Sequence, residues 1–238
     1  MRYFLGVDLG TSSVKALLMD EDGAAAGVAQ RGYDIEKPEP SWAEQDMTRL
    51  WDATAQTLRE LMGKADPCVK RQLAGIGFSG QMHGLVPLGQ DGSPVRRALI
   101  WADQRSGDII ERISQQIPAY RDITLNSLST GFLLCSLLWV REHEPEVYEK
   151  IRRVLLPKDY IRYRMCGELG TDCSDASGTA AFDTGKRQWA WGMIRQLGLE
   201  AELFVPCHES WEVAARVTRR CAEETGLPEG VPVVYGGG

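Results

Sequence analysis

The first segment of the chain constrains the fold most. It is an apolar run over residues 3–9 that contains Asp8 near its end and is followed by a turn of small residues. Residues 3–9 are predicted to form a strand and residues 14–19 a second one. Asp8 ends the first strand, and a carboxylate at the tip of a buried strand is costly unless compensated, as a hydrated Mg²⁺ ion would do. The parts of a phosphate cradle follow it: Gly10, Thr11, Ser12, Ser13 and Lys15. The alternative is a tight turn whose hydroxyls face water.

Strand and helix patterns alternate along the rest of the chain. Further strands are predicted over residues 24–33, 73–78, 85–88, 98–101, 154–156 and 231–235. Helices are predicted over residues 46–62, 132–143, 157–165, 191–197 and 218–225, with Asp46 as the N-cap of the first. The helix over 218–225 and the strand after it would complete a βαβ-like unit. The pattern predicts one α/β domain with a mixed sheet.

Composition narrows the class of protein. The 238 residues allow one large domain or two small ones. A net charge of −6 argues against nucleic acid as a partner, because a backbone binder needs a basic face. The most apolar stretch, 132–140, is far shorter than the roughly 20 residues needed to cross a bilayer. No cleavable signal opens the chain, and the six cysteines lack zinc-site spacing, so we expect reduced thiols, mostly buried, in a cytoplasmic protein.

Three further segments carry candidate binding chemistry. Gln81 and His83 lie with Met82 between two glycines, where they could hydrogen-bond the hydroxyls of a polar ligand; the alternative is a turn with a structurally bonded histidine. Trp101 offers an apolar face to a sugar ring, and Asp103 can bond hydroxyls; alternatively the tryptophan is core and Asp103 forms a surface ion pair with Arg105. Residues 174–179 are either an ordinary polar loop or a close-packed ligand wall.

These segments together resemble one known family. The Asp8-Leu9-Gly10-Thr11 turn looks like the first phosphate motif of the superfamily of sugar kinases, heat-shock-70 proteins and actin. Gln81-Met82-His83-Gly84 is similar to the sugar kinases of the FGGY type and, among them, the xylulokinases. Further motifs match in the family's order over essentially the whole chain: Ser41-Trp42-Ala43-Glu44-Gln45-Asp46, Trp101-x-Asp103-x-Arg105, Leu155-Leu156-Pro157-Lys158-Asp159-Tyr160, and residues 171–179.

The resemblance implies a fold, a reaction and site residues. The fold would be ribonuclease H-like, a mixed sheet flanked by helices. The reaction would be transfer of the γ-phosphoryl group of ATP, with Mg²⁺, to a primary hydroxyl of a ketose such as D-xylulose. Asp8 would position Mg²⁺ and the phosphates as a catalytic residue. Met82 and His83 match the pair that meets the sugar, where glycerol kinases carry Arg-Glu. Gln81, Trp101 and Asp103 would complete the sugar site.

The chain also departs from the family. Ser136 stands where xylulokinases commonly have a lysine. The family's general base directly follows the glycine run that ends at Gly238, and the nucleotide-binding second domain lies beyond it. We therefore expect residues 1–238 to be the N-terminal, sugar-binding domain of a kinase, inactive by itself. Three alternatives remain: a stand-alone, non-catalytic sugar- or phosphate-binding module; a kinase for ribulose, glycerol or gluconate; and a chaperone or filament protein, which Gln81 and Trp101 disfavour. A homodimer is the expected assembly.

Overall fold

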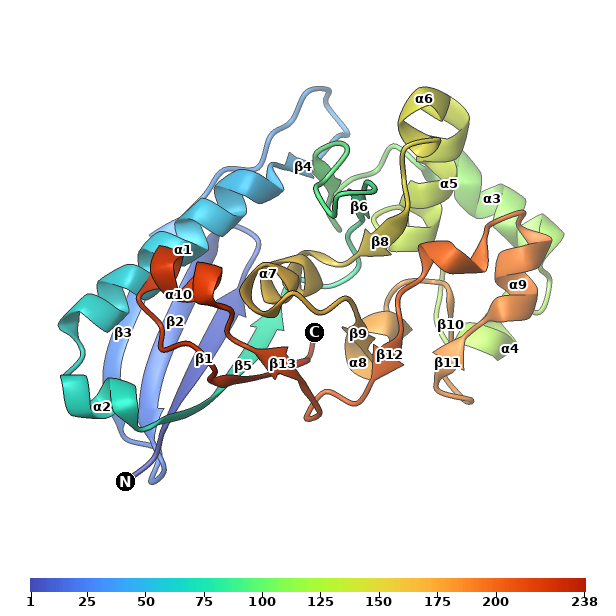
Figure 1. The fold of residues 1–238 in the computed structure, drawn as a ribbon. Helices are drawn as coiled ribbons and strands as arrows, with labels where there is room; N and C mark the ends of the chain where they lie inside the picture. Colours follow the sequence, from blue (N-terminus) through green and yellow to red (C-terminus); the bar gives the residue numbers. More distant parts are fainter.

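A six-stranded mixed sheet organises the two ends of the chain in this computed structural model, which describes all residues 1–238 (Figure 1). The sheet runs in the order β13-β14-β5-β1-β2-β3, with β1 (Tyr3–Leu9), β2 (Ser13–Asp20), β3 (Ala25–Gly32), β5 (Leu73–Gly80), β13 (Val213–Arg216) and β14 (Pro232–Val234). The strands β1, β5 and β14 are parallel neighbours, whereas β2, β3 and β13 join antiparallel. The predicted α/β class with a mixed sheet is confirmed.

The remaining elements lie between β3 and β13, apart from the last helix, which lies between β13 and β14. The helices are α1 (Met47–Lys64), α2 (Pro67–Arg71), α3 (Gly107–Gln116), α4 (Tyr120–Thr124), α5 (Leu133–His143), α6 (Pro145–Tyr148), α7 (Pro157–Cys166), α8 (Cys173–Ser177), α9 (Trp191–Gln196), the 3₁₀ turn η1 (Ala201–Leu203) and α10 (Arg219–Thr225). The short strands are β4 (Glu44–Gln45), β6 (Val86–Leu88), β7 (Ala98–Leu99), β8 (Arg153–Leu155), β9 (Thr171–Asp172), β10 (Phe182–Asp183), β11 (Gln188–Trp189) and β12 (Cys207–His208). None of the helices is both long and apolar enough to span a membrane.

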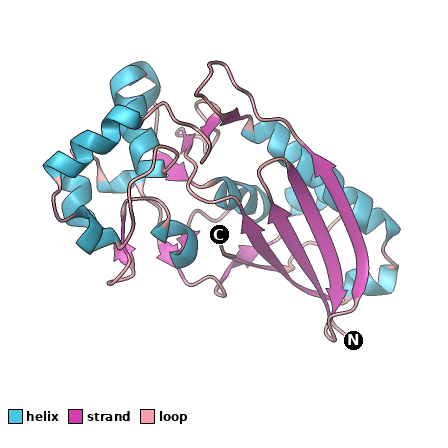
Figure 2. Cartoon of the chain, turned by 180° about the vertical axis from the view of Figure 1, so that it is seen from behind, coloured by secondary structure: helices cyan, strands magenta, loops and turns pink.

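Helices cover only one face of the main sheet. Helix α1 packs on β2 and β3, and α7 packs on β5 (Figure 1). Seen from behind, the long strands lie open (Figure 2). Side chains alternate along β1 accordingly, so Leu5 and Val7 are buried while Phe4 and Asp8 are exposed. The sequence predicts a buried strand here; in the structure only one face of β1 is buried, because the open face of the sheet leaves every second residue in contact with solvent.

Buried apolar side chains form two clusters of similar size, with 32 and 29 residues. The first fills the space between the sheet and helices α1, α7 and α10. The second surrounds α5 in the helical part, drawn on the right of Figure 1. The carboxy-terminal end of the chain lies between the two parts, close to α7 and α8 (Figure 1). The single predicted domain therefore contains two cores.

Most predicted elements are present within two residues of their expected bounds. Helix α1 starts after Asp46, whose carboxylate accepts hydrogen bonds from the amides of Thr48 at 2.8 Å and Arg49 at 3.3 Å, as an N-cap should. The strand predicted over 98–101 is shorter, because a turn closed by the Asp103 amide and the Ile100 carbonyl follows β7. No parallel βαβ unit forms at the end, since β13 runs antiparallel to β14. All six thiols are free, but only three are buried.

Candidate functional site

The carboxyl ends of β1, β5 and β14 meet at one edge of the sheet. The Gln81 amide donates to the Leu9 carbonyl at 2.8 Å, which ties the segment after β5 to the end of β1. The Gly237 amide donates to the Phe78 carbonyl at 3.1 Å, which ties the glycine run after β14 to β5. Ligands of open α/β sheets bind outside this end of the strands. Two segments with predicted site residues and the glycine run thus converge where such a site is expected.

Asp8 lies on the open face of the sheet at the end of β1. Its carboxylate accepts a hydrogen bond from the Ser79 hydroxyl at 2.8 Å, and Lys15 is its cross-strand neighbour on β2. Both side chains are exposed, so burial does not demand a metal here, contrary to the sequence argument. An exposed carboxylate with free lone pairs beside hydroxyls nevertheless offers the oxygen ligands that Mg²⁺ prefers. The residues present fit that ion.

The turn after Asp8 is hydrogen-bonded to β3 and to Tyr33, the residue that follows β3. Gly10 accepts a hydrogen bond on its carbonyl from the Tyr33 hydroxyl. The Ser12 carbonyl accepts from the Tyr33 amide at 3.0 Å, and the Ser13 hydroxyl accepts from the Gln30 amide group at 3.1 Å. These contacts all hold the turn to β3, so the backbone of the predicted cradle is fixed from the side of the sheet.

Thr11 joins the predicted phosphate turn to the predicted sugar site. Its hydroxyl accepts a hydrogen bond from the Trp101 indole at 3.0 Å, and its carbonyl accepts one from the Gln45 side chain at 2.7 Å. Gln81 donates to the Gln45 side-chain oxygen at 2.6 Å, while its own side-chain oxygen is buried without a partner. Trp101 is 50% exposed, so the alternative of a core tryptophan was wrong. The two predicted half-sites are in direct contact.

His83 is held in a strained conformation beside Met82. Its φ is +78°, a left-handed value that a histidine adopts rarely. Residues in such conformations occur most often at functional sites. The ring nitrogen Nδ1 lies 2.7 Å from the Gly178 carbonyl, and the ring stacks on Phe132 with 4.3 Å between centroids. Because a carbonyl can only accept, Nδ1 carries the hydrogen and the neutral ring keeps Nε2 as an acceptor. The structurally bonded histidine is thus present, and it leaves one nitrogen for a ligand hydroxyl.

The Asp103 carboxylate is buried, and both of its oxygens accept hydrogen bonds from other groups of the protein. It accepts hydrogen bonds from the Ala43 amide at 2.7 Å, from the Arg105 amide at 3.0 Å and from the Arg105 guanidinium. Arg105 is 1% exposed and lies over the Trp42 ring at 3.6 Å, so the expected surface ion pair is in fact buried. Asp103 fixes the turn that carries Trp101, and direct contact of Asp103 with a sugar stays a prediction.

Residues 174–179 pack closely against His83 and Met82 instead of forming a polar loop, and their contact with a ligand stays a prediction. Most of the segment belongs to the short helix α8. Gly178 lies so close to His83 that a Cβ there would approach Nδ1 to 2.6 Å, which explains the glycine. The same Cβ would meet the Met82 methyl group at 3.2 Å. The alternative of an ordinary polar loop was wrong.

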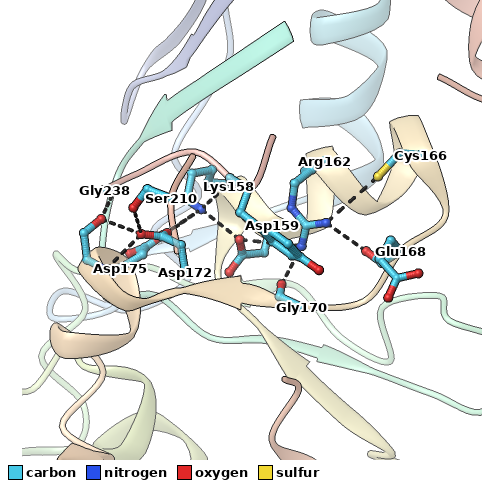
Figure 3. Close-up of polar contacts among 12 residues, drawn as sticks. Lys158, Asp159, Arg162, Cys166, Glu168, Gly170, Asp172, Asp175, Ser210 and Gly238 are labelled. Atoms are coloured by element: carbon cyan, nitrogen blue, oxygen red, sulfur yellow. Dashed lines mark hydrogen bonds and ion pairs between the residues drawn. The ribbon is translucent and has the colours of Figure 1, made fainter. Parts of the chain in front are cut away.

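A buried group of charged residues lies beneath this segment (Figure 3). This group, the Lys158 cluster, consists of Lys158, Asp159, Arg162, Asp172 and Asp175. The Lys158 ammonium lies 2.8 Å from Asp159, 3.0 Å from Asp172 and 3.6 Å from Asp175. All five side chains have no exposed surface, and the hydroxyls of Ser174 and Ser210 donate to the Asp172 carboxylate. Such a cluster needs balanced charge, because each isolated buried ion is costly.

The protonation of the cluster follows from burial, from neighbouring charges and from hydrogen bonds. Burial lowers the pKa of Lys158, but the three carboxylates around it outweigh this and raise it, so the ammonium stays charged. Burial raises the pKa of Asp172, yet Lys158 and the hydroxyl donors bring it below its ordinary value. Burial raises the pKa of Asp175 to about 8 against the attraction of Lys158, and neither oxygen accepts a hydrogen bond. With Asp175 protonated, two cations face two carboxylates.

The sequence argument missed the Lys158 cluster as part of the site. Its motifs entered only through the resemblance, as residues 155–160 and 171–179. One signal was available: Lys158 and Asp159 come one residue after the apolar strand 154–156, in the first turn of the predicted helix 157–165, where an adjacent apolar strand makes charges unexpected. Ser136, at the place of the usual lysine, is buried in α5.

Comparisons with known proteins agree with this geometry. Residues 3–238 match the family model described as the FGGY family of carbohydrate kinases, N-terminal domain. Xylulose kinase from Escherichia coli (strain K12) is 36% identical over 235 residues, which cover 99% of this chain and 48% of that protein. Xylulose kinase from Bacillus subtilis (strain 168) is 36% identical over 238 residues, covering 100% and 48%. The crystal structure of xylulose kinase from Rhodospirillum rubrum is 28% identical, with a TM-score of 0.94 over 100% of this chain and 49% of that one. The chain spans about half the length of these relatives.

Asp175→Asn tests the protonation of the cluster. A group whose pKa is raised by folding contributes stability that is present below its unfolded pKa of about 4 and lost as the pH rises through about 8. The asparagine variant cannot lose a proton, so its unfolding free energy should gain at least about 1.4 kcal/mol on the wild type between about pH 5 and about pH 8. Urea unfolding measures this. Asp52→Asn, exposed on α1, is the control, and its unfolding free energy should follow that of the wild type at each pH. If Asp175→Asn and the wild type show the same dependence of unfolding free energy on pH, Asp175 is not protonated in the folded protein.

Proposed function

Since the chain belongs to the FGGY family of carbohydrate kinases, as its N-terminal domain, we propose that it is the sugar-binding part of an ATP-dependent kinase whose substrate is D-xylulose. The contact between Thr11 and Trp101 carries the proposal. Phosphoryl transfer requires donor and acceptor to be held together, since catalysis is mostly positioning and charge stabilisation. A phosphate turn hydrogen-bonded to a sugar-stacking residue supplies that arrangement.

Each side chain has a proposed task. Trp101 stacks on the sugar, and Gln81 and His83 accept hydrogen bonds from its hydroxyls through the side-chain oxygen and Nε2. Met82 forms the apolar wall, which differs from the Arg-Glu pair that the resemblance gives for glycerol kinases. The relatives named xylulose kinases support a ketose such as D-xylulose over glycerol. Asp103 holds the Trp101 turn in place.

The phosphate end uses the residues after β1. Asp8 would hold Mg²⁺, which supplies charge neutralisation on the transferring phosphoryl group when bound. Gly10, Thr11, Ser12, Ser13 and Lys15 are the proposed contacts of the ATP phosphates. The general base belongs to the position after Gly238 in the resemblance set out above. The proposed cytoplasmic location and homodimeric assembly stay predictions.

His83→Ala in the full-length enzyme should raise the KM for D-xylulose about tenfold, because a ligand hydrogen bond of about 1.4 kcal/mol is lost. The KM for Mg-ATP should change less than twofold. Coupled ADP-release kinetics with each substrate varied in turn give both values. His143→Ala, at the exposed end of α5, is the matched control. Equal effects of His83→Ala on both KM values would remove His83 from the sugar site, and a preference of the wild type for ribulose, glycerol or gluconate would change the substrate.

Asp8→Asn keeps the size and polarity of the side chain but removes its charge. We expect kcat to fall at least about 10²-fold, which is roughly 2.7 kcal/mol of transition-state stabilisation. Asp22→Asn, in the exposed turn after β2, should keep the wild-type kcat. Turnover retained by Asp8→Asn would leave Asp8 as a turn residue only.

The 238-residue chain alone should bind sugar weakly and transfer no phosphate at a useful rate. A positioned general base contributes about 10²–10⁴-fold, and the family's base lies outside this chain. Titration calorimetry with D-xylulose and an ADP-release assay on the same sample separate binding from transfer. Sugar-dependent turnover near about 10 s⁻¹ would mean that a carboxylate of this chain, such as Asp175, serves as the base.

A further inference from the structure

The glycine run Gly236–Gly238 packs closely against the end of β5, Met82 and Asp175. Gly236 has a φ of +81°, and a Cβ there would come 2.5 Å from the Phe78 carbonyl oxygen. A Cβ on Gly238 would come 2.8 Å from the Met82 Cγ and 2.9 Å from Asp175 Oδ1. Only a bare backbone fits this closely, so a small shift of the run would move it against Met82 and the end of β5.

Two of the three amide hydrogen bonds of this run go to serines whose hydroxyls bond one carboxylate, Asp172, and the third, from Gly237, goes to the Phe78 carbonyl. The Gly238 amide donates to the Ser174 hydroxyl at 3.1 Å, and the Gly236 amide donates to the Ser210 carbonyl at 3.0 Å. The hydroxyls of Ser174 and Ser210 both donate to Asp172 at 2.7 Å, and Asp172 accepts from Lys158 at 3.0 Å. Figure 3 shows Lys158, Asp172, Ser210 and Gly238 side by side.

Lys158 also reaches the run directly. Its ammonium donates to the carbonyl of Tyr235, the residue before Gly236, at 3.2 Å. The third hydrogen bond of Lys158 goes to Asp159 at 2.8 Å on its own helix, α7. One fully buried cation therefore connects α7, the β9–α8 junction and the last residue before the glycine run.

Stability does not explain this arrangement. Replacing a buried ion cluster by apolar residues of similar volume is often neutral or stabilising, whereas such clusters fix registry. We propose that Lys158 is a positioning residue of the active site, which fixes the Gly236–Gly238 run against Met82 through the Tyr235 carbonyl and Asp172. The inference rests on the proposed kinase function. In the full-length kinase, Lys158 would then fix the position of the residue after Gly238 from within the protein, without contacting the substrate.

The test uses Lys158→Met in the full-length enzyme, with two readouts. We expect kcat to fall at least about tenfold while the KM for Mg-ATP stays within about twofold. Hydrogen exchange of the Gly236 and Gly237 amides, followed by mass spectrometry, should become at least about tenfold faster. Leu58→Ala, a fully buried position of α1 that faces the first core, is the control for lost stability and should change neither readout while the enzyme remains folded.

A charge-balanced variant separates positioning from folding. Lys158→Met leaves the cluster one negative charge in excess, and adding Asp159→Asn restores neutrality. We expect the double variant to recover thermal stability but not kcat or slow exchange, because the Tyr235 carbonyl still lacks its donor. Recovery of kcat by charge balance alone would overturn the proposal, as would unchanged exchange in Lys158→Met. If the wild-type enzyme shows no sugar-dependent ADP release, the proposed function fails, and the exchange measurement still decides the role of Lys158.

Discussion

The ammonium of Lys158 is the contact on which the geometry of the site depends. A lysine without exposed surface loses its hydration, and only closely placed acceptors compensate for that cost. Two carboxylates and one carbonyl do so within 3.2 Å. These acceptors come from three segments distant in the sequence, so satisfying one cation forces α7, the β9–α8 junction and the end of β14 into a fixed relation. The neutral acid of Asp175 completes the balance without adding a charge.

The sheet provides the second constraint. Parallel pairing of β1, β5 and β14 brings their carboxyl ends to one edge, where the phosphate turn, the Gln81–His83 segment and the glycine run meet. Helices on one face alone leave Asp8 and Lys15 open to solvent, so their charges need no internal partner. The same edge thus combines the exposed Asp8 end, proposed to face the phosphates, with the hydrogen-bonded Gln81–His83 end, proposed to face the sugar.

Much of this could be predicted from sequence because the signals are local. Alternation and helical periodicity located nearly all long elements, and Asp46 marked the start of α1. The one-sided exposure of β1 could not be predicted, since a short apolar strand has the same pattern whether one or both faces are covered. The buried state of Asp103 and the partners of Lys158 depend on tertiary contacts with Ala43, Asp172 and Tyr235, which no sequence spacing encodes.

The contacts of Thr11 join the two ends of the proposed site directly. Its hydroxyl is bonded to Trp101 and its carbonyl to Gln45, which in turn accepts from Gln81. Under the proposed function, a sugar that tilts the Trp101 indole would act on the phosphate turn through the hydrogen bond to Thr11, and a phosphate that shifts the turn would act on Trp101 in the same way. In the proposed kinase, these direct hydrogen bonds would align the phosphate turn with the sugar site before either ligand is bound, which would lower the entropic cost of bringing donor and acceptor together.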